Sequence, residues 1–151
     1  MKSADYEISC KTYAICYKSK NECTVLEEKK EIKIKTNIQK FINYNCEYYG
    51  SSFEGRKKGS KSILGMKYKL PIIIEESREI IFFPTKAYEK EGCSWISLKN
   101  IISYEGNETT KVTFSSGIQK EFNISLESFE NQILRANKLL LILKSRKMKT
   151  H

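Results

Sequence analysis

The sequence predicts an α+β fold: an antiparallel β-sheet with short helices, a basic Gly/Ser loop and a long C-terminal helix. Three observations support this class. Strand-like apolar stretches recur along the chain, turn-forming residues separate them, and one long stretch near the C-terminus has a helical apolar period. The chain has 151 residues, of which 40% are hydrophobic, two are proline and seven are glycine. This composition excludes a disordered chain, and we expect residues 1–151 to form one domain.

The N-terminal part is predicted to form two strands and a short helix. Residues 6–17 and 22–35 have strand character, and residues 18–21 supply the turn between them. Asn37 is expected to cap a helix over residues 38–45, because an asparagine side chain accepts hydrogen bonds from the first helical N–H groups. A strand is the alternative there.

The middle of the chain combines a glycine-rich segment with an apolar hairpin. Residues 50–59 predict either a loop or a short basic helix interrupted by glycines. The apolar stretches 70–75 and 79–83 predict a hairpin, whose second strand ends at Pro84. The acidic residues between these stretches are expected to form a solvated turn and not a catalytic pair.

The last part is predicted to contain further strands and then the long helix. Strands are expected at Trp95–Ile96, at Ile101–Tyr104, and on both sides of the turn Ser116-Gly117. Ser125 is expected to cap a helix that runs to about residue 144, because serine is a preferred N-cap residue.

The C-terminal helix has apolar residues spaced three and four apart, as one face of an α-helix requires; they are Leu126, Phe129, Ile133, Ala136, Leu140 and Leu143. This face predicts packing on the sheet, with a helix–helix contact in a dimer as the alternative. The candidate core or dimer residues are Phe129, Ile133, Ala136 and Leu140.

Charge is concentrated in two short segments. The formal net charge is +9, from 27 Lys and Arg against 18 Asp and Glu. Residues 54–69 carry a net +5 and residues 135–151 a net +6, whereas residues 70–134 carry a net −4. Codon bias in an AT-rich genome can produce a lysine-rich composition, but it does not sort the charge in this way. Nucleic acid is therefore the favoured partner, and an anionic membrane surface is the alternative.

The residues needed for several chemistries are missing. His151 is the only histidine, so neither a Ser-His or Cys-His nucleophile nor a His-containing metal cluster can be built. Five cysteines without a C-x-x-C pair predict reduced thiols. Residues 50–57 and 55–62 each match only part of the phosphate-binding P-loop pattern. We expect no enzyme activity, no metal and no cofactor.

The sequence also carries no membrane signal. Residues 1–7 lack the apolar core of a signal peptide, and the longest apolar runs, 72–74 and 139–143, are far too short to span a bilayer. A cytoplasmic protein is expected.

The Gly/Ser segment is the strongest candidate for a binding site. Its cations suit the phosphate oxygens of a nucleic-acid backbone, and its glycines are expected to shape the loop and free backbone N–H groups. The candidate DNA-binding residues are Arg56, Lys57, Lys58, Lys61, Ser51 and Ser52, and the candidate loop-shaping residues are Gly50, Gly55 and Gly59. Tyr49 and Phe53 are more typical of a core, as are Phe83 and Trp95. An ordinary solvated turn is the alternative.

At this segment the sequence resembles a known family. The blocks that carry the resemblance are YGSSFEGRKKG (49–59), PI (71–72), IFFPT (81–85), CSWIS (93–97), VTFSSG (112–117) and SFENQ (128–132). In order and rough spacing they are similar to the competence transcription factor family of Gram-positive bacteria (ComK), from about residue 45 to residue 136.

The resemblance implies a transcription activator that binds AT-rich promoter boxes of DNA-uptake genes, mainly through the minor groove, as a dimer or a pair of dimers. It implies double-stranded DNA, RNA polymerase and an adaptor of a Clp protease as partners. Typical members continue well past the helix, whereas this sequence stops at His151. A truncated regulator that binds DNA or a full-length relative without activating is therefore an alternative, and an RNA-binding or anionic-surface-binding protein is another.

Overall fold

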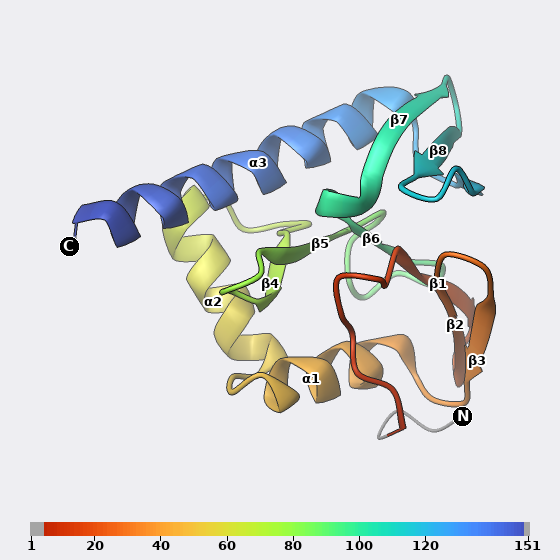
Figure 1. The fold of residues 1–151 in the computed structure, drawn as a ribbon, viewed down its shortest axis with the longest axis horizontal. Coiled ribbons are helices and arrows are strands. Elements are labelled where there is room, and N and C mark those ends of the chain that lie inside the picture. Colours follow the sequence, from red (N-terminus) through yellow and green to blue (C-terminus); the bar gives the residue numbers. More distant parts are fainter. Residues whose placement is uncertain (1–4, 150–151) are drawn as a thin grey trace.

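The computed structural model describes residues 5–149, so the first four residues of the N-terminal stretch and His151 lie outside the described residues. Within this range the α+β class is confirmed: the chain forms two antiparallel sheets and three α-helices, the last of which is long (Figure 1). The fold brings the two basic segments onto helices at one end of the larger sheet.

The larger sheet has six strands in the order β3-β2-β1-β6-β5-β4, and all its neighbouring strands are antiparallel. Its strands are β1 (Ala14–Ser19), β2 (Glu22–Leu26), β3 (Glu31–Ile34), β4 (Ile72–Glu75), β5 (Ile80–Pro84) and β6 (Trp95–Ser97). Pro84 is the last residue of β5, as its missing N–H predicts.

The smaller sheet has three strands in the order β7-β8-β9. They are β7 (Ile101–Gly106), β8 (Thr110–Phe114) and β9 (Gln119–Phe122). Gly117 forms the β8–β9 turn with φ +92°, a left-handed conformation that glycine adopts without steric cost. The one-turn helix η2 (Leu98–Asn100) links β6 to β7.

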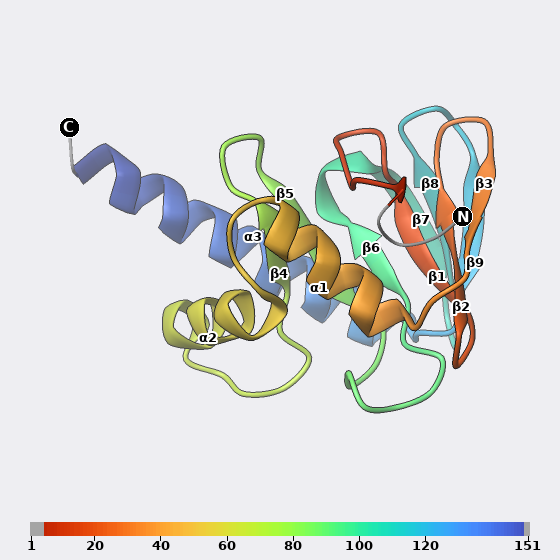
Figure 2. The ribbon, with the colours of Figure 1, turned by 90° about the horizontal axis from the view of Figure 1, so that it is seen from below.

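The three helices surround the larger sheet. They are α1 (Ile38–Tyr48), α2 (Phe53–Leu64) and α3 (Leu126–Lys149). Asn37 caps α1, since its side chain accepts hydrogen bonds from the N–H groups of Gln39 and Lys40. Helix α1 covers one face of the sheet, α3 lies on the opposite side, and α2 runs between them (Figures 1 and 2).

Side chains on the two faces of the larger sheet build two apolar clusters. The first lies under α1 and includes Ile15, Phe41 and Trp95, all fully buried. The second lies between this sheet, the smaller sheet and α3, and it includes Phe83 and Phe129. Strand β5 contributes alternate residues to each cluster and is buried on both faces, which explains its continuous apolar sequence.

Three boundaries differ from the sequence-based expectation. Residues 6–13 are not part of a strand: the N–H of Ile8 donates to Asn45 Oδ1 of α1 at 2.6 Å, and the N–H of Thr12 closes a turn by donating to the carbonyl of Ser9. Residues 22–35 form two strands, β2 and β3, separated by a turn in which the N–H of Glu27 donates to the carbonyl of Lys30. Helix α3 continues to Lys149, past the expected end.

Candidate nucleic-acid interface

The Gly/Ser segment forms a helix, which corrects the expectation of a basic loop and agrees with its helical alternative. The Ser52 side chain caps α2 by accepting from the N–H of Gly55 at 3.0 Å. The helix ends where the N–H of Gly65, at φ +68°, donates to the carbonyl of Lys61. Burial of the apolar residues Phe53 and Leu64 on one face stabilises a helix that its glycine content alone disfavours.

This helix changes the roles of the glycines. Gly50 lies in the turn between α1 and α2 with φ +90°, a left-handed conformation that favours glycine. Gly55 and Gly59 lie inside α2 and shape no loop. A Cβ at residue 55 would stand 3.0 Å from Ser51 Oγ and 3.2 Å from Ser52 Oγ, so glycine there leaves room for the cap. A Cβ at Gly59 would meet nothing within 4 Å.

The helix separates cations that are adjacent in the sequence, because successive residues differ by about 100° around a helix axis. Arg56 is half-buried on the flank near α1, and its Nε–H is buried without a hydrogen-bond partner. Burial raises the pKa of the Cys46 thiol in α1 to about 12, and the Arg56 cation opposes that shift. Lys58 and Lys61 are exposed on the other side of α2.

Lys57 joins these lysines to an aromatic cluster. Its Nζ lies 5.6 Å from the ring centroid of Tyr88, within reach of a cation–π interaction. Tyr88 in turn stacks on the buried Trp95 at 5.3 Å between ring centroids, and burial raises the pKa of its phenol well above the ordinary value. Trp95 and Phe83 are core residues, as the sequence predicts.

Three residues next to Lys57 were not predicted from the sequence to belong to the binding site. Lys67, Tyr68 and Lys69 follow α2 and line a hollow of about 120 Å³ together with Lys57 and Tyr88; Ala87 and the acidic Glu89 complete its lining. Tyr68 is 74% exposed. An aromatic residue between two lysines is a pattern typical of nucleic-acid-binding surfaces. This pattern in the sequence could have identified the three residues. We call Lys57, Lys58, Lys61, Lys67, Tyr68 and Lys69 the α2 surface.

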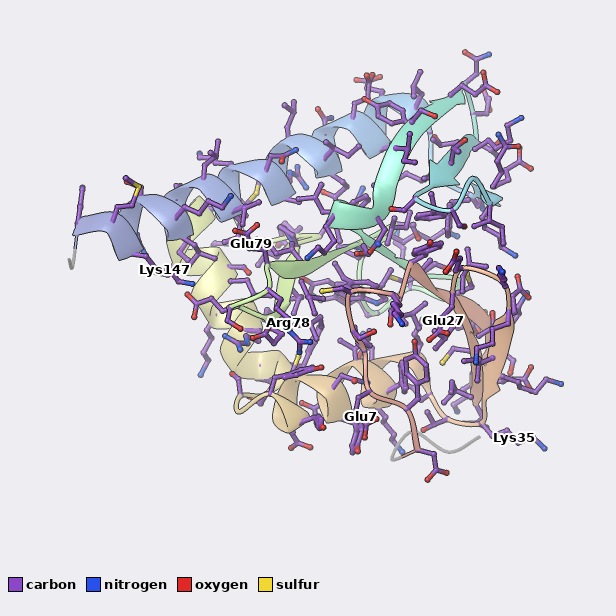
Figure 3. The ribbon with its side chains drawn as sticks, in the orientation of Figure 1. Glu7, Glu27, Lys35, Arg78, Glu79 and Lys147 are labelled. Carbon is purple, nitrogen blue, oxygen red and sulfur yellow. The ribbon has the colours of Figure 1, made fainter. Side chains whose placement is uncertain are left out.

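The lysines of the α2 surface differ from those near the end of α3 in their ion pairing. Within residues 5–149, none of them forms an ion pair with a carboxylate. At the end of α3, by contrast, Lys144 lies 3.2 Å from Glu79 and Lys147 lies 3.8 Å from Glu76, and both glutamates belong to the β4–β5 turn. Figure 3 labels Lys147 and Glu79 on these two elements. The α2 surface is therefore the better site for an external polyanion.

The two serines predicted as DNA contacts lie between α1 and α2. Ser52 is the N-cap, and the N–H of Ser51 donates to the carbonyl of Cys46 at 2.9 Å. Both side chains are half-buried. Their predicted contact with DNA remains a prediction.

The candidate residues of α3 lie on its inner side. Phe129 and Ala136 are buried, and Ile133 and Leu140 are half-buried against the same apolar cluster. A different face of α3 exposes Leu134, Leu141 and Met148, at 68%, 66% and 78%. This outer face is a second apolar surface of α3, apart from the buried one.

The described residues offer other chemistry little support. Among residues 5–149, no group of three or more His, Cys, Asp or Glu side chains could hold a metal ion. The five cysteines are free thiols. No helix within that range is long and apolar enough to cross a membrane.

The fold and the α2 surface together define a class: an α+β protein with a lysine-rich helix at one end of an antiparallel sheet. Residues 3–148 match the model of the ComK protein family, so the chain belongs to that family. The resemblance noted in the sequence is thereby confirmed.

One relative is informative. The competence transcription factor of Bacillus subtilis (strain 168) is 38% identical over 96 residues, which are 62% of this chain and 50% of that protein. The chain thus spans about half the length of the curated relative that it matches. No solved structure matches the chain.

Proposed function

We propose that this protein is a cytoplasmic, DNA-binding transcription factor that activates competence genes. The observation that carries the proposal is the α2 surface, whose lysines form no ion pair within residues 5–149, because closely spaced cations without ion-pair partners gain most from phosphate contacts. Family membership supports the same function, since the Bacillus subtilis relative is a competence transcription factor.

The preferred ligand in this proposal is AT-rich duplex DNA, bound mainly in the minor groove. Narrow A·T minor grooves carry an enhanced negative potential that attracts cationic side chains. In this arrangement the lysines of α2 contact phosphates. The width and the negative potential of the minor groove then determine which DNA sequence is preferred. Arg56 is an auxiliary cation, since its side chain lies on the α1 flank.

Assembly and partners are part of the proposal. A dimer, or a pair of dimers, would match paired promoter boxes, because a symmetric protein reads a symmetric site. The outer face of α3 supports this, since its exposed residues Leu134, Leu141 and Met148 are spaced seven apart. RNA polymerase and an adaptor of a Clp protease are the protein partners that the family suggests.

The decisive experiment measures affinity for AT-rich duplex, GC-rich duplex and single-stranded RNA at several salt concentrations. We expect the AT-rich duplex to bind most tightly. Lys61→Gln should weaken binding to every sequence and reduce the slope of log K against log salt by about one unit, because one phosphate contact is lost. Lys18→Gln is the matched control, since Lys18 is exposed at the far end of β1. Equal affinity for the three ligands, or an unchanged slope for Lys61→Gln, would contradict the proposal.

A reporter assay addresses the alternative of a regulator that binds without activating. Expression of this chain should raise transcription from a competence promoter. If this chain instead lowers the transcription that a full-length relative activates, it is an antagonist that occupies the promoter boxes or binds the relative.

A further inference from the structure

The turn after α2 presents an aromatic ring to solvent. Tyr68 lies between Lys67 and Lys69, and 74% of its surface is exposed, the largest exposed fraction among the tyrosines of residues 5–149. Exposure alone is ordinary for a single side chain. The anchoring of the surrounding turn is what distinguishes Tyr68.

The turn is fixed to the protein at both ends. Gly65 ends α2 in the left-handed conformation, and Met66 then packs against the second apolar cluster. Leu70 is fully buried, and its carbonyl accepts a hydrogen bond from Tyr88 Oη at 2.6 Å. Only the segment between Met66 and Leu70 projects from the body.

A buried amide of α3 holds the projecting segment from the other side. Gln132 is 1% exposed, and its Nε2 donates to the carbonyl of Lys69 at 3.0 Å and to that of Pro84 at 2.8 Å. Arg135 fixes the orientation of this amide by donating to Gln132 Oε1 at 2.9 Å. A polar residue at a core position of α3 therefore positions the turn.

These bonds maintain an unusual backbone. Lys69 has φ +54°, in the left-handed region that residues other than glycine rarely adopt. Such a conformation persists where the surrounding structure over-determines it, and it occurs often at ligand-binding sites. The ring of Tyr68 is thus presented by a preorganised turn, which lowers the entropy lost on binding.

The ring stands among the cations of the α2 surface. Tyr68 lines the same hollow as Lys57, Lys67 and Lys69. Aromatic side chains beside a cationic track stack on nucleic-acid bases or wedge between base steps, while the cations contact the backbone.

We propose that Tyr68 is the base-contacting residue of the α2 surface, stacking on or wedging into a base step of the DNA whose phosphates the neighbouring lysines hold. This inference rests on the proposed function and adds a residue that reads the DNA. Flexible pyrimidine–purine steps such as TA, which unstack most easily, are the expected point of contact.

Substitutions of Tyr68 and Lys67 separate the contribution of base stacking from that of charge. Tyr68→Ala should weaken binding to an AT-rich duplex containing TA steps roughly tenfold and leave the salt slope unchanged, since no charge is lost. Lys67→Gln should reduce the slope by about one unit. Tyr48→Ala is the matched control, because Tyr48 is also exposed, at 53%, but lies on α1 with its ring edge-on to Tyr49. Tyr68→Phe should bind like the wild type, because stacking needs the ring and not the hydroxyl.

Fluorescence provides a direct readout that does not depend on affinity. Trp95 is the only tryptophan and is fully buried, so Tyr68→Trp adds an exposed indole as reporter. Saturating AT-rich duplex should quench this indole strongly, while Tyr48→Trp should change little.

The outcomes distinguish the two proposals. Wild-type affinity of a folded Tyr68→Ala variant, or an unquenched Tyr68→Trp in a saturated complex, overturns the role of Tyr68 and leaves the DNA-binding function intact. Failure of the wild type to bind any duplex overturns the proposed function itself.

Discussion

At the scale of single residues, Gly59 has no structural explanation within the described chain. It lies inside α2, is exposed, and has no positive φ. A glycine in a helix interior costs about 0.5–1 kcal/mol relative to alanine, and the open space above this one would admit a methyl group. Open space above a backbone between lysines is what close approach of a phosphate chain requires.

Gly59→Ala should therefore separate stability from binding. We expect the free energy of unfolding to rise by about 0.5–1 kcal/mol, measured by chemical denaturation, and the affinity for AT-rich duplex to fall. Gly65→Ala is the control, since its surroundings are equally open but its φ of +68° makes alanine destabilising. A stabilised Gly59→Ala variant with wild-type DNA affinity would place Gly59 outside the interface.

At the scale of elements, α2 illustrates what the sequence could not specify. Three glycines within ten residues favour a loop by local propensity. The segment is nevertheless helical because Ser52 caps it and one face is buried against the body. Residues that are contiguous in sequence consequently diverge: Arg56 turns toward α1, while Lys58 and Lys61 face solvent.

Other elements also differ in whether local sequence or contacts with distant residues determine their structure. The α3 helix, its N-terminal Ser125 and the β8–β9 turn are readable from spacing and turn chemistry, and they are observed as expected. The N-terminal segment 6–13 alternates like a strand, but in the fold both backbone groups of Ile8 bond to side chains of distant residues, Asn45 and Tyr49. The turn at Tyr68 was missed for a similar reason, since its anchors Tyr88 and Gln132 become neighbours only in the fold.

The N-cap of α2 gives a prediction at this scale. Ser52→Ala should lower the free energy of unfolding by about 1 kcal/mol, because the N–H of Gly55 loses its acceptor. Ser62→Ala, an exposed change in the same helix, should have little effect, and thermal or chemical denaturation measures both. If the two variants are equally stable, the cap does not hold α2 in solution. DNA affinity should fall for Ser52→Ala only as far as fraying of the first turn disturbs Lys57 and Lys58.

At the scale of the whole molecule, the net charge of +9 comes from two basic segments that differ in their ion pairing. Within residues 5–149 the lysines of the α2 surface form no ion pair, whereas the β4–β5 turn partly neutralises the end of α3. Exposed ion pairs of this kind contribute little stability, roughly 0–1 kcal/mol each, but they lower the local potential. DNA held on α2 would leave the outer face of α3 open to a second copy of the chain.

That arrangement predicts self-association through the outer face of α3. Its exposed residues Leu134, Leu141 and Met148 repeat every seven positions, the period at which a helix presents one seam to another helix. Leu141→Glu should raise the dissociation constant of a dimer roughly tenfold or more, because a carboxylate would be buried without a partner. Sedimentation velocity or light scattering measures this shift.

The matched control for Leu141→Glu is Ile102→Glu, which also replaces an exposed apolar side chain by a carboxylate. Ile102 is 63% exposed and lies on β7. It should leave the dimer intact. The monomeric variant should also bind paired AT-rich boxes more weakly than the wild type while binding a single box equally well, because it loses the gain of linked half-sites. A wild-type chain that remains monomeric at concentrations that saturate paired boxes would show that the seam on α3 does not join two copies, and that α2 binds each box independently.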